Sequence, residues 1–292
     1  MFPGPNLSMS HSELHQCVQY ARAQMARHGT EWTFMMPLYV LGHFFGDQWV
    51  QQNLFKEGFL KPPSKAVDRS KQLQVGMTGY QLAEALFNLQ AVAGFPGIHC
   101  HLSAGELEPC IGEPEAAKFL KSRGEQIRSV TPQGSIGNDY DLEIKRDAGE
   151  ICCEVKIKLE AETLTAKGSF NSLERARKQL PKDKPGLIFL RIVGNTTNTE
   201  LQGKAHLVQG AVKRLFAQTE RVVGVILLTH MYEFSEKNQT LWDLWRTIPN
   251  PKSQYPTSLL DGFSNRHIDV TPDSPHWTYL AKYRPRFLQG LL

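Results

Sequence analysis

Apolar and polar residues alternate in two different ways along the chain. In residues 1–108 the apolar positions recur at helical spacing, as in the series Leu14, Val18, Ala21 and Met25. The same spacing recurs in the segments 39–55 and 80–92. The pattern therefore predicts a helical N-terminal region over residues 1–108.

Residues 109–231 combine helical patterns with short apolar or alternating segments. The expected helices are Glu115–Val130 (interrupted or ended at Gly124), Ser172–Leu180 and Ala205–Gln218, and the expected strands are Asp139–Lys145, Glu150–Leu159, Gly186–Val193 and Val222–Thr229. Strands alternating with helices predict an α/β fold with a mixed sheet flanked by helices. Residues 232–292 are rich in proline and tryptophan, and we expect an irregular C-terminal extension packed on this core.

The strand expected at 150–159 carries a group of charged residues on one face. Side chains alternate along a strand, so Glu154, Lys156 and Lys158 share one face. The residues on the opposite face, including Ile151 and Val155, are apolar. This strand is expected to bury one face in the core and to present charge on the other.

The turn before this strand decides which residue faces Glu154. A turn centred on Asp147-Ala148 places Asp141 directly opposite, with Cβ atoms about 5 Å apart. Moving the turn back by one residue pairs Asp139 with Glu154 instead. The first register is preferred because it puts Gly149 just after the turn, where a positive φ is often needed.

Two facing carboxylates and a neighbouring lysine suit phosphodiester hydrolysis. Asp141 and Glu154 would repel each other unless a cation lay between them. Mg²⁺ is commonly held by one or two carboxylates together with water and substrate phosphate. Lys156 could hold or deprotonate the attacking water and offset charge on the phosphorane. The alternative is a solvated strand face with a weak ion pair.

This arrangement resembles the PD-(D/E)XK nuclease superfamily, which has the restriction endonuclease-like fold. Its order of helix, three-stranded meander, helix and strand is similar to residues 111–193, and its Asp and Glu-x-Lys motif is similar to Asp141 and Glu154-Val155-Lys156. The resemblance implies a fold and a chemistry class, an enzyme that cuts phosphodiester bonds with Mg²⁺ or, as a substitute, Mn²⁺, and does not name the substrate. It also implies that Glu113 belongs to the catalytic site. The proline of the motif is absent, and Asn138-Asp139 could imitate it, so Asp139 stays an alternative to Asp141.

Four residues are candidates for contacting nucleic acid. Lys158 follows the motif on the same strand face, and Arg175 and Lys178 belong to a basic cluster on the next helix. Gln179 resembles a glutamine that the superfamily often carries on this helix. A solvated helix face is an equally good explanation of the basic cluster.

Composition sets broad limits on the protein class. The chain has 292 residues, a net charge of +4 and 41% hydrophobic residues, which is typical of a globular protein and compatible with nucleic-acid binding. The five cysteines are odd in number and two are adjacent, which favours reduced thiols in a cytoplasmic protein. No signal peptide or membrane span is expected.

The leading functional hypothesis is a metal-dependent nuclease acting on DNA. The alternative is a catalytically inactive nuclease-fold domain that binds nucleic acid or a protein partner, and a third hypothesis makes residues 1–108 the functional module. The sequence leaves open DNA against RNA and endonuclease against exonuclease. Cutting of two paired strands would favour a homodimer.

Overall fold

The computed structural model describes residues 5–28, 32–55, 69–104, 110–131, 134, 137–147, 149–158, 164–192, 198–234, 239–263 and 275–283. The chain forms two compact units. The first contains Met1–Lys118 and Pro272–Leu292, and the second contains Phe119–Thr271. In the ranges given above, no helix has both the length and the apolar character that crossing a membrane requires.

The first unit is helical, as the spacing of apolar residues predicted. Its elements are α1 (His11–His28), α2 (Trp32–Val50), the π-helical turn Gln51–Phe55, α3 (Arg69–Leu89), α4 (Phe95–Ala104), the start of α6 (Gly112–Lys121) and the short 3₁₀ helix Leu280–Tyr283. The buried carboxylate of Glu84 accepts hydrogen bonds from Trp277 Nε1 at 3.0 Å and from the backbone N–H of Leu280 at 2.9 Å. These bonds attach the C-terminal segment to α3.

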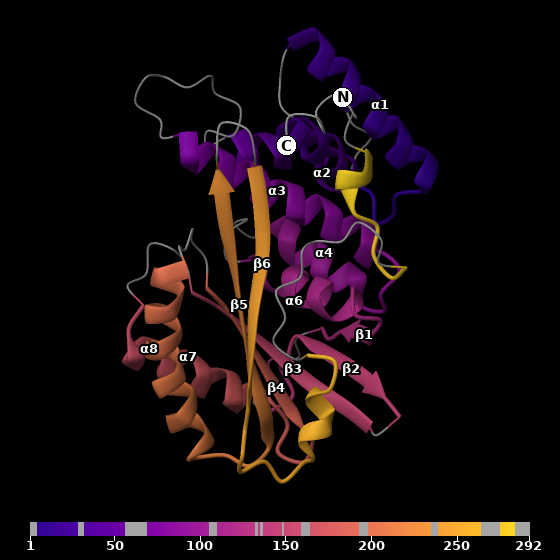
Figure 1. Cartoon of the computed structure of the whole chain (residues 1–292). Coiled ribbons are helices and arrows are strands. Elements are labelled where there is room, and N and C mark those ends of the chain that lie inside the picture. Colours follow the sequence, from indigo (N-terminus) through magenta and orange to yellow (C-terminus); the bar gives the residue numbers. More distant parts are fainter. Residues whose placement is uncertain are drawn as a thin grey trace. The chain divides into compact units, whose positions relative to one another are not determined.

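The second unit is built on a mixed sheet (Figure 1). Its strands are β1 (Gln126–Ser129), β2 (Leu142–Arg146), β3 (Gly149–Lys158), β4 (Gly186–Ile192), β5 (Val222–Phe234) and β6 (Gln239–Pro249), and they lie in this order across the sheet. The pairs β3–β4 and β4–β5 are parallel and the others are antiparallel. The parallel pairs are joined by α7 (Ala166–Gln179) and α8 (Asn198–Phe216). The predicted α/β fold class, a mixed sheet with flanking helices, is therefore confirmed.

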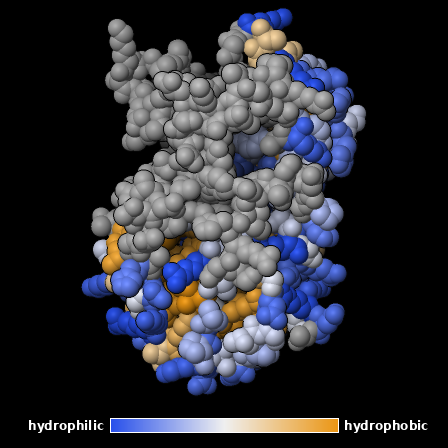
Figure 2. Space-filling model, in the orientation of Figure 1, coloured by the Kyte–Doolittle hydropathy of each residue, from blue (hydrophilic) through white to orange (hydrophobic). Residues whose placement is uncertain are grey.

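Both faces of this sheet are covered. On one face, α7 and α8 contribute Leu173 and Leu215 to a buried cluster that also contains Cys152 of β3. On the other face, the ring of Phe119 packs against those of Phe189 and Phe263, with centroids 5.7 and 5.8 Å apart. Figure 2 shows hydrophilic residues over most of the visible rim of this unit, around a smaller hydrophobic area. The central strands consequently have an apolar layer on either side.

The expected helix Glu115–Val130 is wrong in its second half. Helix α6 ends at Lys121, Gly124 follows with φ = 83°, and Gln126–Ser129 forms β1. Only four residues make this strand, too few to show a period of two in the sequence.

The C-terminal extension also needs correction, because Gln239–Pro249 forms the long strand β6 instead of irregular structure. Trp245 packs against Phe119, whereas Ile248 packs against the cluster under α7 and α8. Apolar residues therefore occur at both parities, and the alternation that marks a half-exposed strand is missing.

Candidate functional site

The hairpin of β2 and β3 has the predicted register. Arg146 pairs with Gly149 and Leu142 pairs with Cys153, so continuing the pairing places Asp141 opposite Glu154. The backbone N–H of Asp141 donates to the Cys153 carbonyl at 3.0 Å, which extends the ladder to this position. Gly149 has φ = 121°, as expected for the residue after the turn. The register confirms that Asp141 and Glu154 share one face of the hairpin.

Glu154 is a buried carboxylate in which one of the two oxygens accepts a hydrogen bond from the described residues. Its side chain is 1% exposed, and Oε1 accepts a hydrogen bond from Lys156 Nζ. Oε2 is buried and has no hydrogen-bond partner among the described residues. Burial, followed by the charge of Asp141, raises the pKa of Glu154 to about 8, and Lys156 only partly offsets both effects. At neutral pH the isolated chain therefore favours a protonated Glu154.

The hairpin itself fixes the position of Asp141. Its Oδ2 accepts a hydrogen bond from the backbone N–H of Val155 at 2.7 Å, across the strand pair. Asp139, the alternative partner, uses Oδ1 to accept a bond from Gly134 N at 3.0 Å. Both aspartates raise the pKa of Glu154, but Asp141 does so more strongly than Asp139. The geometry therefore favours Asp141 as the partner of Glu154, with Asp139 beside the pair.

Lys156 is positioned by the last residue of α7. Its Nζ donates to Gln179 Oε1 at 2.6 Å as well as to Glu154 Oε1. Gln179 is itself anchored, because its Nε2 donates to the Asp139 carbonyl at 3.2 Å and its own carbonyl accepts from Asp139 N at 3.3 Å. Gln179, expected to contact nucleic acid, thus holds the lysine between helix and hairpin.

A second buried glutamate on the same face, Glu143, has hydrogen-bond partners for its carboxylate. Glu143 is 0% exposed and receives hydrogen bonds from Arg128 at 2.9 and 2.6 Å and from Tyr140 Oη at 3.1 Å. The Arg128 guanidinium, followed by Tyr140, holds the pKa of Glu143 below its ordinary value. The alternative of a solvated strand face does not hold at Glu143 and Glu154, because both side chains are buried. Of these two buried carboxylates, Glu154 is the one with an oxygen that finds no partner in the residues that the structure describes.

The remaining predicted residues lie on α6, at the end of β3 and on α7. Glu113 is in the first turn of α6, in the first unit, where its carboxylate lies 3.8 Å from His101 Nδ1. Lys158 ends β3, two residues beyond Lys156. Arg175 and Lys178 are exposed on α7, and Lys178 Nζ lies 3.8 Å from Glu174. Their contacts with nucleic acid stay predictions.

The Asp141–Glu154 pair fits the requirements of Mg²⁺. In the described part of the chain, no group of three or more histidine, cysteine, aspartate or glutamate residues is arranged to hold a metal. Mg²⁺ needs fewer protein ligands, because one or two carboxylates together with water and phosphate commonly suffice. The unpartnered Oε2 of Glu154 is a buried oxygen whose charge a cation would stabilise. The site is therefore compatible with a magnesium ion.

Comparison with known proteins leaves the family open. No family model matches the sequence, and no curated protein matches it. Among solved structures, SfsA of Pyrococcus furiosus in complex with Ca²⁺ is similar at 16% identity and a TM-score of 0.21, over 48% of this chain and 60% of that chain. The chain thus spans less than two thirds of SfsA, and a TM-score this low does not show a shared fold. Function has to be argued from the site itself.

Proposed function

We propose that this protein is a Mg²⁺-dependent nuclease that hydrolyses phosphodiester bonds in DNA. The observation that carries the proposal is the pairing of Asp141 with Glu154 beside Lys156, in which the buried Oε2 of Glu154 has no hydrogen-bond partner in the described part of the chain. An ionised carboxylate in this position is costly unless a cation compensates it. A DNA phosphate that approaches such a cation would supply a further oxygen ligand beside bound water.

Each residue has a distinct task in this proposal. Asp141 and Glu154 would hold the ion, and Mn²⁺ could replace Mg²⁺ there. The metal, when bound, polarises the scissile phosphate and helps to generate hydroxide. Lys156 orients the attacking water through its ammonium group and offsets negative charge that develops on the phosphate. Gln179 keeps Lys156 in place through the 2.6 Å hydrogen bond.

The electrostatics of the site couple metal binding to a proton. The pKa of Glu154 is about 8 without a cation, so binding at pH 7 should release close to one proton from this carboxyl group. Affinity for Mg²⁺ should then rise with pH up to about 8 and level off above it. Calorimetry in buffers of different ionisation enthalpy measures this proton release directly.

A cleavage assay tests the activity. The full chain is incubated with single-stranded, double-stranded and branched DNA and with RNA, in Mg²⁺, Mn²⁺ or EDTA. We expect metal-dependent cleavage of at least one DNA substrate, with losses of at least about 100-fold for Asp141→Asn and Lys156→Ala. Asp147→Asn is the matched control, because Asp147 is exposed in the turn of the same hairpin. Equal activity of wild type, both site variants and the control would refute the assignment.

Metal titration separates this proposal from a non-catalytic nuclease-fold domain that binds nucleic acid or protein. The proposal requires a Mn²⁺ site that is lost in Asp141→Asn and kept in Asp147→Asn. A chain that binds DNA but neither takes up metal nor cleaves would support the non-catalytic alternative.

A further inference from the structure

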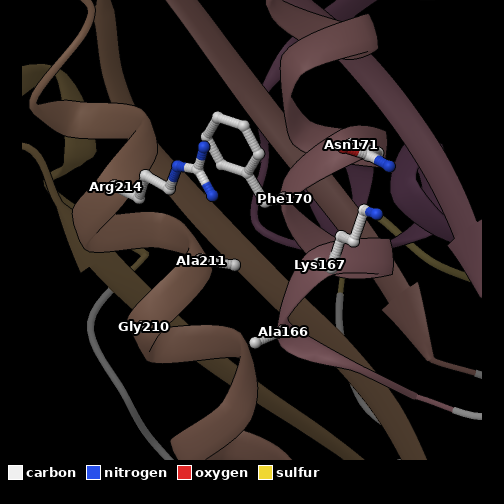
Figure 3. A pocket seen from close by; sticks show the side chains of 7 residues that line it. All are labelled: Ala166, Lys167, Phe170, Asn171, Gly210, Ala211 and Arg214. Carbon is white, nitrogen blue, oxygen red and sulfur yellow. The ribbon is translucent and has the colours of Figure 1, made fainter.

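A basic pocket lies in the second unit, separate from the carboxylates. It has a volume of about 470 Å³ and forms where the end of α7, the turn between α8 and β5, and the segment after β6 meet. Its basic lining residues are Arg177, Lys182, Arg221 and Lys252. A second cavity of about 310 Å³, between α7 and α8, has a mainly apolar wall in which Arg214 stacks on Phe170 at 4.1 Å (Figure 3). The charge of the first pocket makes it the better candidate for a ligand site.

Hydrogen bonds join the chain segments that form the walls of this basic pocket. Asn250 is fully buried, and its Nδ2 donates to the carbonyls of Thr219 at 2.9 Å and Val222 at 2.8 Å. The backbone N–H of Gln254 donates to the Glu220 carbonyl at 2.8 Å. These bonds join the α8–β5 turn to the segment after β6. The pocket is consequently preformed, so that a ligand would not have to order its walls.

Basic residues outnumber acidic ones in the described lining of the pocket. Glu220 is the acidic residue in the lining, against four basic ones. Glu174, outside the lining, pairs with Arg177 at 2.9 and 2.6 Å, and even with Glu174 counted the local charge stays positive. Lys182 and Lys252 are exposed at the rim. A concave surface with excess positive charge concentrates anions.

Arg221 adds an independent sign of a missing anion. Its Nη2 donates to the Arg177 carbonyl, while its Nε is buried and has no hydrogen-bond partner among the described residues. Burial, followed by the neighbouring charge of Arg177, lowers the pKa of Arg221. Arg177 and Arg221 therefore line the same pocket, and the Arg221 guanidinium has a donor that no described residue satisfies. An anion with several acceptor oxygens would supply both the charge and the hydrogen bonds.

We propose that this basic pocket binds a phosphate group of a nucleic-acid strand. Arginine matches the geometry of phosphate oxygens, and rim lysines can contact a flexible backbone as point charges. Arg177 lies two residues before Gln179, so the pocket and the carboxylate site share the C-terminal end of α7. The choice of a strand, instead of free phosphate, rests on the nuclease function proposed above.

Binding of labelled DNA in EDTA tests this site without any cleavage. The double variant Lys182→Gln/Lys252→Gln removes two exposed rim charges without disturbing the core. We expect its Kd for DNA to rise about 10-fold and the slope of log K against log salt to fall by about 1 to 2, since each phosphate contact contributes roughly 0.7 to 0.9. The matched control is Lys167→Gln/Lys213→Gln, which removes two exposed lysines outside this pocket. Equal affinity and salt slope for both double variants would overturn the proposal.

Inorganic phosphate serves as the second probe. Inorganic phosphate should raise the Tm of wild type if the pocket binds it. If the rim variant loses this thermal shift but keeps wild-type DNA affinity, the pocket binds free phosphate, and the proposal that it binds a nucleic-acid strand is overturned. The result is independent of catalysis: weakened DNA binding with no cleavage by wild type leaves the pocket standing and removes the nuclease. Metal-dependent cleavage by wild type, together with unchanged DNA binding by the rim variant, supports the nuclease and overturns the pocket.

Discussion

Replacing Glu154 with glutamine should stabilise the metal-free protein. Glutamine has nearly the same shape, and its Oε1 can still accept the hydrogen bond from Lys156 Nζ. It removes the negative charge that burial and Asp141 make unfavourable. Protonated glutamate and glutamine both leave a neutral polar group at the position of the unpartnered Oε2, so the remaining difference between the two proteins is this charge.

The size and sign of the effect follow from the pKa of Glu154, which rises from an ordinary 4.5 to about 8 in the folded chain. A raised folded-state pKa gives stability that is fully present below pH 4.5 and is lost as pH rises through 8. Each pKa unit corresponds to about 1.4 kcal/mol, so the loss reaches about 3 kcal/mol at pH 7 and roughly 4 to 5 kcal/mol above pH 8. No reduction for solvent screening applies, because Glu154 is 1% exposed. Glu154→Gln should match wild type at pH 4 and exceed it increasingly toward pH 9.

Urea denaturation in EDTA at several pH values measures this difference as a change in the free energy of unfolding. Glu150→Gln is the control, because Glu150 lies on the same strand but pairs with Lys184 at about 40% exposure and should change stability by less than about 0.5 kcal/mol. Mg²⁺ should then stabilise wild type and leave Glu154→Gln nearly unchanged. A difference between variant and wild type that is flat with pH would show that Glu154 ionises normally, and the electrostatic argument for a cation would fail.

Three further predictions concern neighbouring groups. Gln179→Ala should lower kcat about 10-fold with little change in Tm, because Lys156 loses the hydrogen bond that positions it; steady-state kinetics and a thermal melt check both parts. Gly149→Ala should destabilise the fold by about 1 kcal/mol or more in urea denaturation, since φ = 121° is strained for alanine although the space around it is open. Arg128→Met should cost about 2 kcal/mol at pH 7, reduced from a fully buried pair because Arg128 is 46% exposed. The cost should shrink as pH falls and Glu143 becomes protonated, since the lowered pKa of Glu143 gives stability that is lost on acidification.

The part of the site that lies on one hairpin could be predicted from the sequence. Strand parity, the turn at Asp147 and the glycine at 149 favoured Asp141 over Asp139 as the residue opposite Glu154, and the structure has this register. Such local pairings depend only on turn geometry and the period of two. Contacts between distant segments carry no comparable signal. The bond between Gln179 and Lys156 joins residues 23 positions apart and depends on how α7 crosses the sheet.

Burial on both faces explains what sequence analysis missed. Cys152 and Glu143 lie on the face that was expected to present charge, yet both are 0% exposed. A charged residue normally indicates an exposed position, but Arg128 and Tyr140 satisfy Glu143 so fully that it can lie in the interior. Strand β6 was missed for the same reason, because its apolar residues do not alternate with polar ones. Single-residue polarity predicts solvent exposure poorly wherever a second chain segment supplies the partner.

The contrast between the two buried glutamates is the strongest argument that this face has a function. Glu143 receives three hydrogen bonds, and its pKa is lowered. Glu154, on the same face, has an unpartnered oxygen, an aspartate opposite and a raised pKa. A core selected for stability alone would be better served by an apolar residue in place of Glu154, because a buried carboxylate that its lysine partner compensates only in part costs several kcal/mol. An unfavourable charge that the rest of the fold has to support is typical of binding and catalytic sites. A hard divalent cation has the charge to offset these carboxylates and prefers oxygen ligands, which is why the proposed activity depends on metal.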